Sequence, residues 1–232
     1  MPMCYYTSQH KEIKEIKAAF NLPVKNEALF EQAYQLNGFA KPYLPVISTG
    51  DSKAIDMYRW GLVPFWVKDE STFKANTLNA RSEELFDKPS YRNSWDKRCL
   101  VICTGFFEPH YPEGSKKSQS FYIKPREAEF FTLGGIWSKW KDIYTFSIVM
   151  VEANPLLAEI HNDKKRMPLI LEGEQAEAWL LPDLTKPEMT DLMKPYPHEE
   201  KLIAYRVLDG VTNSRIDTNV PEVIEPFKMN FK

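Results

Sequence analysis

The residues of this chain that could do chemistry are a cysteine near the start and three polar residues at the ends of predicted elements. Cys4 directly follows Met3, so a chain that starts at Met3 and loses that methionine would begin with Cys4. Its amine and its thiol would then belong to the same residue. Asn79 lies in "NARSE", Glu108 in "GFFEPH" and His161 in "EIHNDKKRMP".

A free α-amine beside a thiol is a pair that captures aldehydes. The pKa of an α-amine is about 7.7–8.0, against about 10.4 for lysine, so roughly a tenth of it is uncharged at neutral pH. That amine can condense reversibly with an aldehyde to give an imine. The thiol can then close a five-membered ring on the imine carbon, because an internal nucleophile has a very high effective concentration. This chemistry requires cysteine as the first residue.

Each of the other three residues also has a structural interpretation. Asn79 suits a turn or a cap, and Glu108 suits one half of an ion pair. His161 follows "LLAEI", where the dipole at the end of a helix favours a histidine. Familiar signatures such as the Walker loop, G-x-S-x-G and H-E-x-x-H do not occur. Three further histidines have no special sequence context: His10, His110 and His198.

Taken together, these stretches resemble the SOS-response-associated peptidase (SRAP) family, the abasic-site processing proteins. The matching features are Cys4, "RWGLVPFW" (59–66), "NARSE", "GFFEP" and a histidine followed by "RMPLIL", in the family's order over residues 4–171. The resemblance implies one domain over residues 1–232, binding of single-stranded DNA that contains abasic sites, and a covalent thiazolidine crosslink to the N-terminal cysteine. An autoproteolytic or peptidase activity that exposes this cysteine, and lyase-like chemistry, also come with the family.

The resemblance also implies a role for each residue of the site. Glu108 would hold the amine and exchange protons with it. His161 would act as acid and base in sugar ring opening and imine formation, since its reference pKa is near neutral. Asn79 would orient the sugar or the terminus through hydrogen bonds. Cys4, Asn79, Glu108 and His161 are therefore the expected catalytic residues.

Five residues are expected to contact DNA. Arg81 and Arg166 would grip phosphates, which positions a strand without reading its sequence. Trp60, Trp66 and Pro64 would line a wall or wedge on which bases stack. Core packing is the competing interpretation of both tryptophans. Lys164 and Lys165 either widen this basic rim or belong to a solvated loop.

The chain departs from the family pattern in three places. Tyr5 and Tyr6 follow the cysteine where the family usually has Gly-Arg, so an expected phosphate contact is missing. Pro109 replaces a tryptophan in "GFYEW". Four residues, 162–165, separate His161 from "RMP" where one is typical, so the resemblance does not fix the position of Arg166.

Two other functions remain open on the sequence. A cysteine peptidase would use Cys4 with His161 and would turn over peptides even with residues in front of Cys4. A non-covalent binder of single-stranded or junction DNA would act through its aromatic residues and arginines, and a Cys4→Ala change would leave its effect intact.

Composition narrows the class of protein. Of 232 residues, 43% are hydrophobic and 27% are charged, which predicts a packed core. The net charge of −2 argues against a globally basic nucleic-acid binder but allows a local basic groove. Three cysteines and the lack of a signal peptide or apolar span predict a cytoplasmic protein. We expect a monomer without cofactor or metal.

The elements that must position the site are mainly strands. Short β-branched and aromatic stretches bounded by turn residues predict strands over 43–49, 54–66, 97–108, 119–125, 129–140, 143–152, 166–172 and 201–209. Helices are predicted over 10–21 (capped by Ser8), 25–37, 154–161, 173–181 and 186–196. Without regular βαβ alternation, this pattern predicts a single α+β domain with an antiparallel β-barrel-like core and flanking short helices. Alternation of Cys99, Val101 and Cys103 predicts a buried face.

Overall fold

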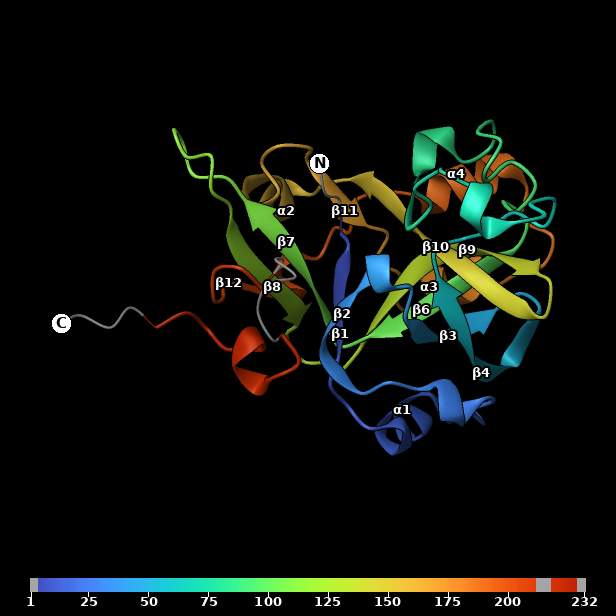
Figure 1. The fold of residues 1–232 in the computed structure, drawn as a ribbon, viewed down its shortest axis with the longest axis horizontal. Helices are drawn as coiled ribbons and strands as arrows, with labels where there is room; N and C mark the ends of the chain where they lie inside the picture. The colour runs from blue at the N-terminus through green and yellow to red at the C-terminus, as the bar shows by residue number, and fades with distance from the viewer. Residues whose placement is uncertain (1–3, 212–217, 229–232) are drawn as a thin grey trace.

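The computed structural model describes residues 4–211 and 218–228, which form two β-sheets flanked by short helices (Figure 1). The proposed start at Met3 lies outside the described residues. The first sheet has five strands in the order β12-β8-β7-β1-β2. Their bounds are Leu202–Arg206 for β12, Gln119–Pro125 for β8, Gly105–His110 for β7, Tyr6–Gln9 for β1 and Ala33–Asn37 for β2.

The second sheet closes into a ring. Its strand order is β11-β10-β4-β3-β6-β9, and β10 also pairs with β9, so five strands surround a common interior. The strand β5 pairs with β10 outside this ring, and the β10–β4 and β10–β5 pairings are parallel. The bounds are Tyr43–Ser48 (β3), Asp51–Trp60 (β4), Asn79–Arg81 (β5), Arg98–Cys103 (β6), Phe131–Trp140 (β9), Ile143–Glu152 (β10) and Arg166–Pro168 (β11). The predicted α+β class with a barrel-like sheet core is confirmed.

The two sheets are joined where the sequence predicts one continuous strand over 97–108. The chain leaves β6 at Cys103, passes Thr104 and enters β7 at Gly105, in the other sheet. A Cβ at Gly105 would lie 2.4 Å from the Tyr122 ring, so only glycine allows this approach. The prediction missed the break because both strands are apolar and buried.

In the described residues, four short α-helices and six 3-10 turns lie around the sheets. The α-helices are α1 (Ile13–Phe20), α2 (Pro155–Ile160), α3 (Gly173–Trp179) and α4 (Lys186–Leu192). The 3-10 turns are η1 (Glu27–Leu29), η2 (Gly38–Ala40), η3 (Glu70–Thr72), η4 (Ser82–Glu84), η5 (Glu199–Lys201) and η6 (Pro221–Ile224). The predicted helix over 25–37 is wrong, since this stretch contains only η1 and strand β2, whose pairing with β1 overrides local helix propensity.

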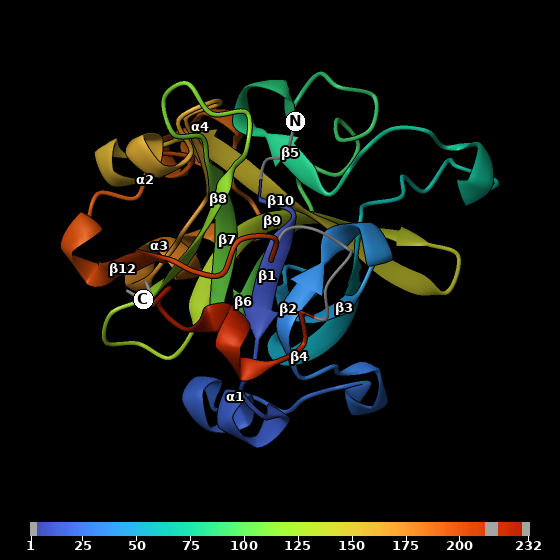
Figure 2. The ribbon, with the colours of Figure 1, turned by 60° about the vertical axis from the view of Figure 1, so that its left-hand side comes forward.

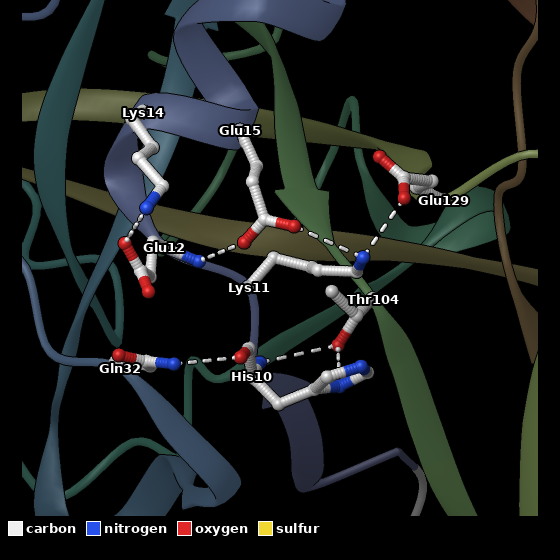
Figure 3. A network of polar contacts seen from close by, with 8 residues as sticks. All are labelled: His10, Lys11, Glu12, Lys14, Glu15, Gln32, Thr104 and Glu129. Carbon is white, nitrogen blue, oxygen red and sulfur yellow. Dashed lines mark hydrogen bonds and ion pairs between the residues drawn. The ribbon is translucent and has the colours of Figure 1, made fainter.

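The start of α1 differs from the prediction. Ser8 belongs to β1, and Glu12 is the N-cap, with Glu15 completing a capping box. Lys11 links Glu15 to Glu129 at 3.0 and 2.8 Å (Figure 3). These contacts hold α1 at the end of the molecule opposite α2, as both ribbon views show (Figures 1 and 2).

The core lies inside the ring and between the two sheets. Trp60 is completely buried there, stacked on Phe146 with ring centroids 6.2 Å apart, and its indole N–H donates to the Leu78 carbonyl at 2.8 Å. Cys99 and Cys103 are buried as free thiols, as the alternation predicts. Among the described helices, none has the length and apolar character needed to cross a membrane.

Candidate functional site

The four expected catalytic residues come from four separate elements that meet where the sheets adjoin. Cys4 lies just before β1, and Glu108 lies on β7. The antiparallel register places Tyr6 opposite Phe107, so the chain preceding β1 runs alongside Glu108. Asn79 begins β5, and His161 caps the C-terminal end of α2. All four side chains are buried.

Cys4 is held by Asn79. The Asn79 side-chain amide donates to the Cys4 carbonyl at 3.0 Å. The Asn79 carbonyl in turn accepts a hydrogen bond from the hydroxyl of Tyr91 at 2.8 Å, and Tyr91 is also buried. Asn79 therefore connects the cysteine to strand β5 and, through the β5–β10 pairing, to the ring.

Burial controls the protonation of this cluster. Burial raises the pKa of Glu108 to about 7, although the charge of His161 and the thiol and backbone of Cys4 act against that rise. The Cys4 thiol and backbone approach Glu108, although neither carboxylate oxygen makes a hydrogen bond of regular geometry with another described residue. The pKa of the Cys4 thiol is raised well above its usual value by burial and by the Glu108 charge.

Arg166 and Glu108 both lie beside the His161 ring. Its Nδ1 atom lies 3.0 Å from the carbonyl of Arg166 and 3.7 Å from Oε2 of Glu108. Because a carbonyl only accepts, Nδ1 carries the proton, and Nε2 is the basic nitrogen of the neutral ring. A histidine and a carboxyl group with a near-neutral pKa thus adjoin a cysteine, which is a set suited to proton exchange.

The two predicted phosphate-binding arginines lie on strands that both pair with β10. Arg81 ends β5 and contacts Glu84 at 3.3 Å, with 43% of its side chain exposed. Arg166 begins β11 and forms a two-point ion pair with Glu83. The longer 162–165 segment does not displace Arg166 from the site, since its carbonyl bonds His161. Lys164 and Lys165 are exposed.

The predicted stacking wall is only partly at the surface. Trp66 is 47% exposed and lies edge-to-face against Phe73. Trp60 and Pro64 are buried, and a DNA contact by either is therefore a wrong expectation in this structure. The indole of Trp60 packs in the core, which is the competing interpretation of this tryptophan given above.

Sequence reasoning missed two exposed aromatic side chains and a cavity. Phe65 and Phe39 are 60% and 56% exposed. Phe39 lines a cavity of about 250 Å³, together with Phe73, Lys74 and residues 75–78. The ring of Tyr5 lies edge-on to Phe39 at 4.8 Å and its hydroxyl bonds Asn76 at 3.1 Å. The cavity therefore adjoins Tyr5, the residue after Cys4. The sequence could not indicate it, because local sequence does not distinguish an exposed phenylalanine from a buried one.

The described residues contain no group of three or more His, Cys, Asp or Glu side chains arranged to hold a metal ion.

Comparison with known proteins places these residues in a wider group. A family model described as SOS response associated peptidase (SRAP) matches residues 3–214. Abasic site processing protein YoqW of Bacillus subtilis is 31% identical over 233 residues, covering 96% of this chain and 99% of its own. Abasic site processing protein HMCES of Gallus gallus is 32% identical over 198 residues, covering 74% of this chain and 57% of its own.

A crystal structure shares the fold closely. A protein from Bacteroides thetaiotaomicron aligns with a TM-score of 0.86 and 31% identity, over 97% of this chain and all of that chain.

Proposed function

The chain belongs to the SOS response associated peptidase (SRAP) family, and from that premise we propose that it binds single-stranded DNA with abasic sites and joins Cys4 to the ring-opened sugar as a thiazolidine. The names of its relatives support abasic-site processing. The observation that carries the finer proposal is the cluster of Cys4, Asn79, Glu108 and His161, with Glu108 and His161 3.7 Å apart.

The reaction begins once Cys4 is the first residue of the chain. Its uncharged amine adds to the aldehyde carbon of the open sugar and forms a C–N bond. The resulting carbinolamine loses its hydroxyl group as water after protonation, which leaves an imine. The thiol sulfur then bonds to the imine carbon, and its proton ends on the nitrogen. One water is released, and no oxidant or reductant is needed.

Glu108 and His161 suit the proton transfers of this sequence. The pKa of Glu108 is raised to about 7, so at neutral pH the carboxyl group exists in both forms and can give a proton or take one. The raised pKa of the Cys4 thiol means that the sulfur needs a base when it attacks. Glu108, its neighbour, is that base. Nε2 of His161 takes up a proton and, once protonated, supplies the acid for sugar opening and loss of water.

The surroundings of Cys4 suit a single strand better than a duplex. Phe39 beside Tyr5, and Trp66, which contacts Phe73 in the lining of the same cavity, offer exposed rings on which unpaired bases can stack. Arg81 and Arg166 lie beside the cluster and suit phosphate contacts. Lys74 lines the cavity next to Tyr5 and adds a cation. It suits a phosphate of the nucleotides that adjoin the abasic site.

The raised pKa of the Cys4 thiol weighs against the peptidase alternative. Catalytic cysteines are activated by a lowered pKa, since the thiolate is the nucleophile. Cys4 has the opposite environment, being buried beside a carboxylate. Thiazolidine formation tolerates this because the thiol attacks within the same residue, where proximity compensates for the low fraction of thiolate and Glu108 removes the proton during attack.

The proposal is tested by the intact mass of the protein after mixing with an abasic single-stranded oligonucleotide without reductant. We expect a one-to-one adduct, lighter than the sum by one water, on chains that begin at Cys4, and it should survive denaturation. The matched controls are Cys4→Ser, which lacks the thiol, and an oligonucleotide with a tetrahydrofuran abasic analogue, which lacks the aldehyde.

Three results would contradict the proposal. A chain that begins at Cys4 and yields no adduct would reject the crosslink. Turnover of peptides by a chain that retains residues before Cys4, lost in Cys4→Ser, would support the peptidase instead. Equal DNA protection by wild type and Cys4→Ala would support a non-covalent binder.

A further inference from the structure

The end of strand β7 is fastened to the end of helix α2 on both sides of His161. His110 is the last residue of β7, two positions after Glu108, so both side chains project from the same face of the strand. The His110 Nδ1 atom lies 3.2 Å from the carbonyl oxygens of both Glu159 and Ile160. These carbonyls belong to the last turn of α2, where helices leave acceptors without an internal partner.

The next residue repeats the contact on the other side of His161. The Tyr111 amide donates to Oδ1 of Asn162 at 3.1 Å, and Nδ2 of Asn162 donates to the Tyr111 carbonyl at 2.7 Å. Asn162 thus pairs with the backbone of Tyr111 as a strand neighbour would. Two consecutive residues after Glu108 and Pro109 therefore hold the residues immediately before and after His161.

From this geometry we propose that His110 and Asn162 form a clamp that sets the position of His161 against Glu108. The functional consequence rests on the proposed crosslinking reaction, whereas the positioning itself does not. His110 and Asn162 are positioning residues, because their hydrogen bonds are made to backbone and not to the site.

The chemistry of the His110 contact is specific. Both partners are carbonyl oxygens, so Nδ1 must carry a hydrogen, and only a side chain with a donor at that place can substitute. The ring also lies edge-to-face against Phe121, with centroids 5.6 Å apart. Packing and hydrogen bonding are therefore separable: phenylalanine keeps the ring and loses the donor, and asparagine keeps a donor and loses the ring.

The test compares His110→Phe, His110→Asn and Asn162→Ala with wild type in the full chain. Hydrogen exchange of the His161 Nδ1–H, which faces the Arg166 carbonyl, reports by nitrogen-resolved NMR how well His161 is held. We expect exchange about tenfold faster in His110→Phe and Asn162→Ala, the effect of losing one hydrogen bond on a local opening. In His110→Asn we expect exchange within about twofold of wild type.

Two controls distinguish positioning of His161 from a general contribution of His110 to the stability of the fold. Amide exchange in β6 should stay at the wild-type rate, since the clamp governs a local opening and not global unfolding. His198→Phe removes an exposed histidine that contacts Glu200 and the ring of Tyr196 and should leave the His161 signal unchanged. A uniform rise in exchange across β6 would instead assign His110 to overall stability and overturn the proposal.

The functional arm uses protein whose intact mass shows Cys4 as its first residue. We expect His110→Phe to slow adduct formation about tenfold in single turnover, because small displacements of a proton-transfer group have large effects. His110→Asn should restore it. Wild-type rates of both exchange and adduct formation in His110→Phe would overturn the clamp. If wild type forms no adduct, the crosslinking function fails, and the exchange measurement alone still decides the positioning.

Discussion

Glu108 is the residue whose protonation depends most on the fold. Its carboxyl group is 1% exposed on β7, and its pKa is raised from 4.5 to about 7, first by burial. The folded protein therefore keeps a proton on Glu108 over a pH range in which the unfolded chain has lost it. The stability contributed by this proton is complete below about pH 4.5 and is lost as the pH rises through about 7.

Glu108→Gln should remove this dependence. We expect the variant to gain stability relative to wild type between pH 4.5 and 7, by roughly 3 kcal/mol at the upper end, at about 1.36 kcal/mol per pH unit between the two pKa values. Urea unfolding of both proteins at several pH values measures the difference. An unchanged difference across this range would show that Glu108 is not held neutral by the fold.

Asn79 acts on the cysteine backbone, through the 3.0 Å bond from its amide to the Cys4 carbonyl. We expect Asn79→Ala to slow single-turnover adduct formation about tenfold, since the terminus loses its fixed orientation. The unfolding free energy should fall by only about 1 kcal/mol. Asn93→Ala, at an exposed position, is the matched control. A wild-type rate in Asn79→Ala would remove Asn79 from the proposed site.

At the scale of elements, a buried arginine joins β6 to α3. Arg98 begins β6 and is completely buried. Its guanidinium donates to the Trp179 carbonyl at 3.0 Å and to the carbonyl of Leu181. These are acceptors at the C-terminal end of α3, where a helix has unsatisfied carbonyls and a negative dipole end. The charge is thus compensated by carbonyl dipoles of a neighbouring element.

Arg98→Met should therefore remove the hydrogen bonds that join the end of α3 to strand β6 of the ring. Methionine fills a similar volume but leaves buried carbonyls without donors, which costs about 3 kcal/mol or more. The free energy of unfolding, measured in urea, should fall by that amount. The exposed Arg92→Met should change it by less than about 0.5 kcal/mol. Similar values for the two variants would contradict the bridging role of Arg98.

At the scale of the whole molecule, the net charge of −2 gives no general attraction to DNA. The proposed binding of DNA would then depend on local cations. In the described structure several of these cations are paired with carboxylates. Arg166 pairs with Glu83, and Arg81 pairs with Glu84. In the proposed function a phosphate would compete with these carboxylates, so Glu83 and Glu84 would lower the affinity for a strand that the arginines favour.

Glu83→Gln should accordingly tighten binding. We expect affinity for a single-stranded oligonucleotide with a tetrahydrofuran site to rise severalfold, because Arg166 loses its two-point partner but keeps its charge. Arg166→Met should weaken binding and reduce the slope of log affinity against log salt by about 1. Fluorescence anisotropy at several salt concentrations measures both. The exposed Glu222→Gln on η6 is the charge-matched control, and an equal gain there would point to net charge alone.

The sequence by itself determined the kinds of groups in the site and most of the strands. Cys4, Asn79, Glu108 and His161 are each ambiguous alone, and the family resemblance makes them the expected site, which stays a prediction. Alternating apolar residues predict most of the strands, including β3, β9 and β10. Both depend on residue identity and on near neighbours in the chain, which a sequence displays directly.

Tertiary structure alone decided which of these residues meet. The antiparallel register of β1 against β7 brings Cys4 beside Glu108, and the break at Thr104 sends β7 to the other sheet. The tertiary structure also determines that Trp60 is buried, that Phe39 is exposed and that His110 contacts two carbonyl oxygens. These outcomes depend on contacts between residues far apart in the chain, and local propensity carries no information about such contacts.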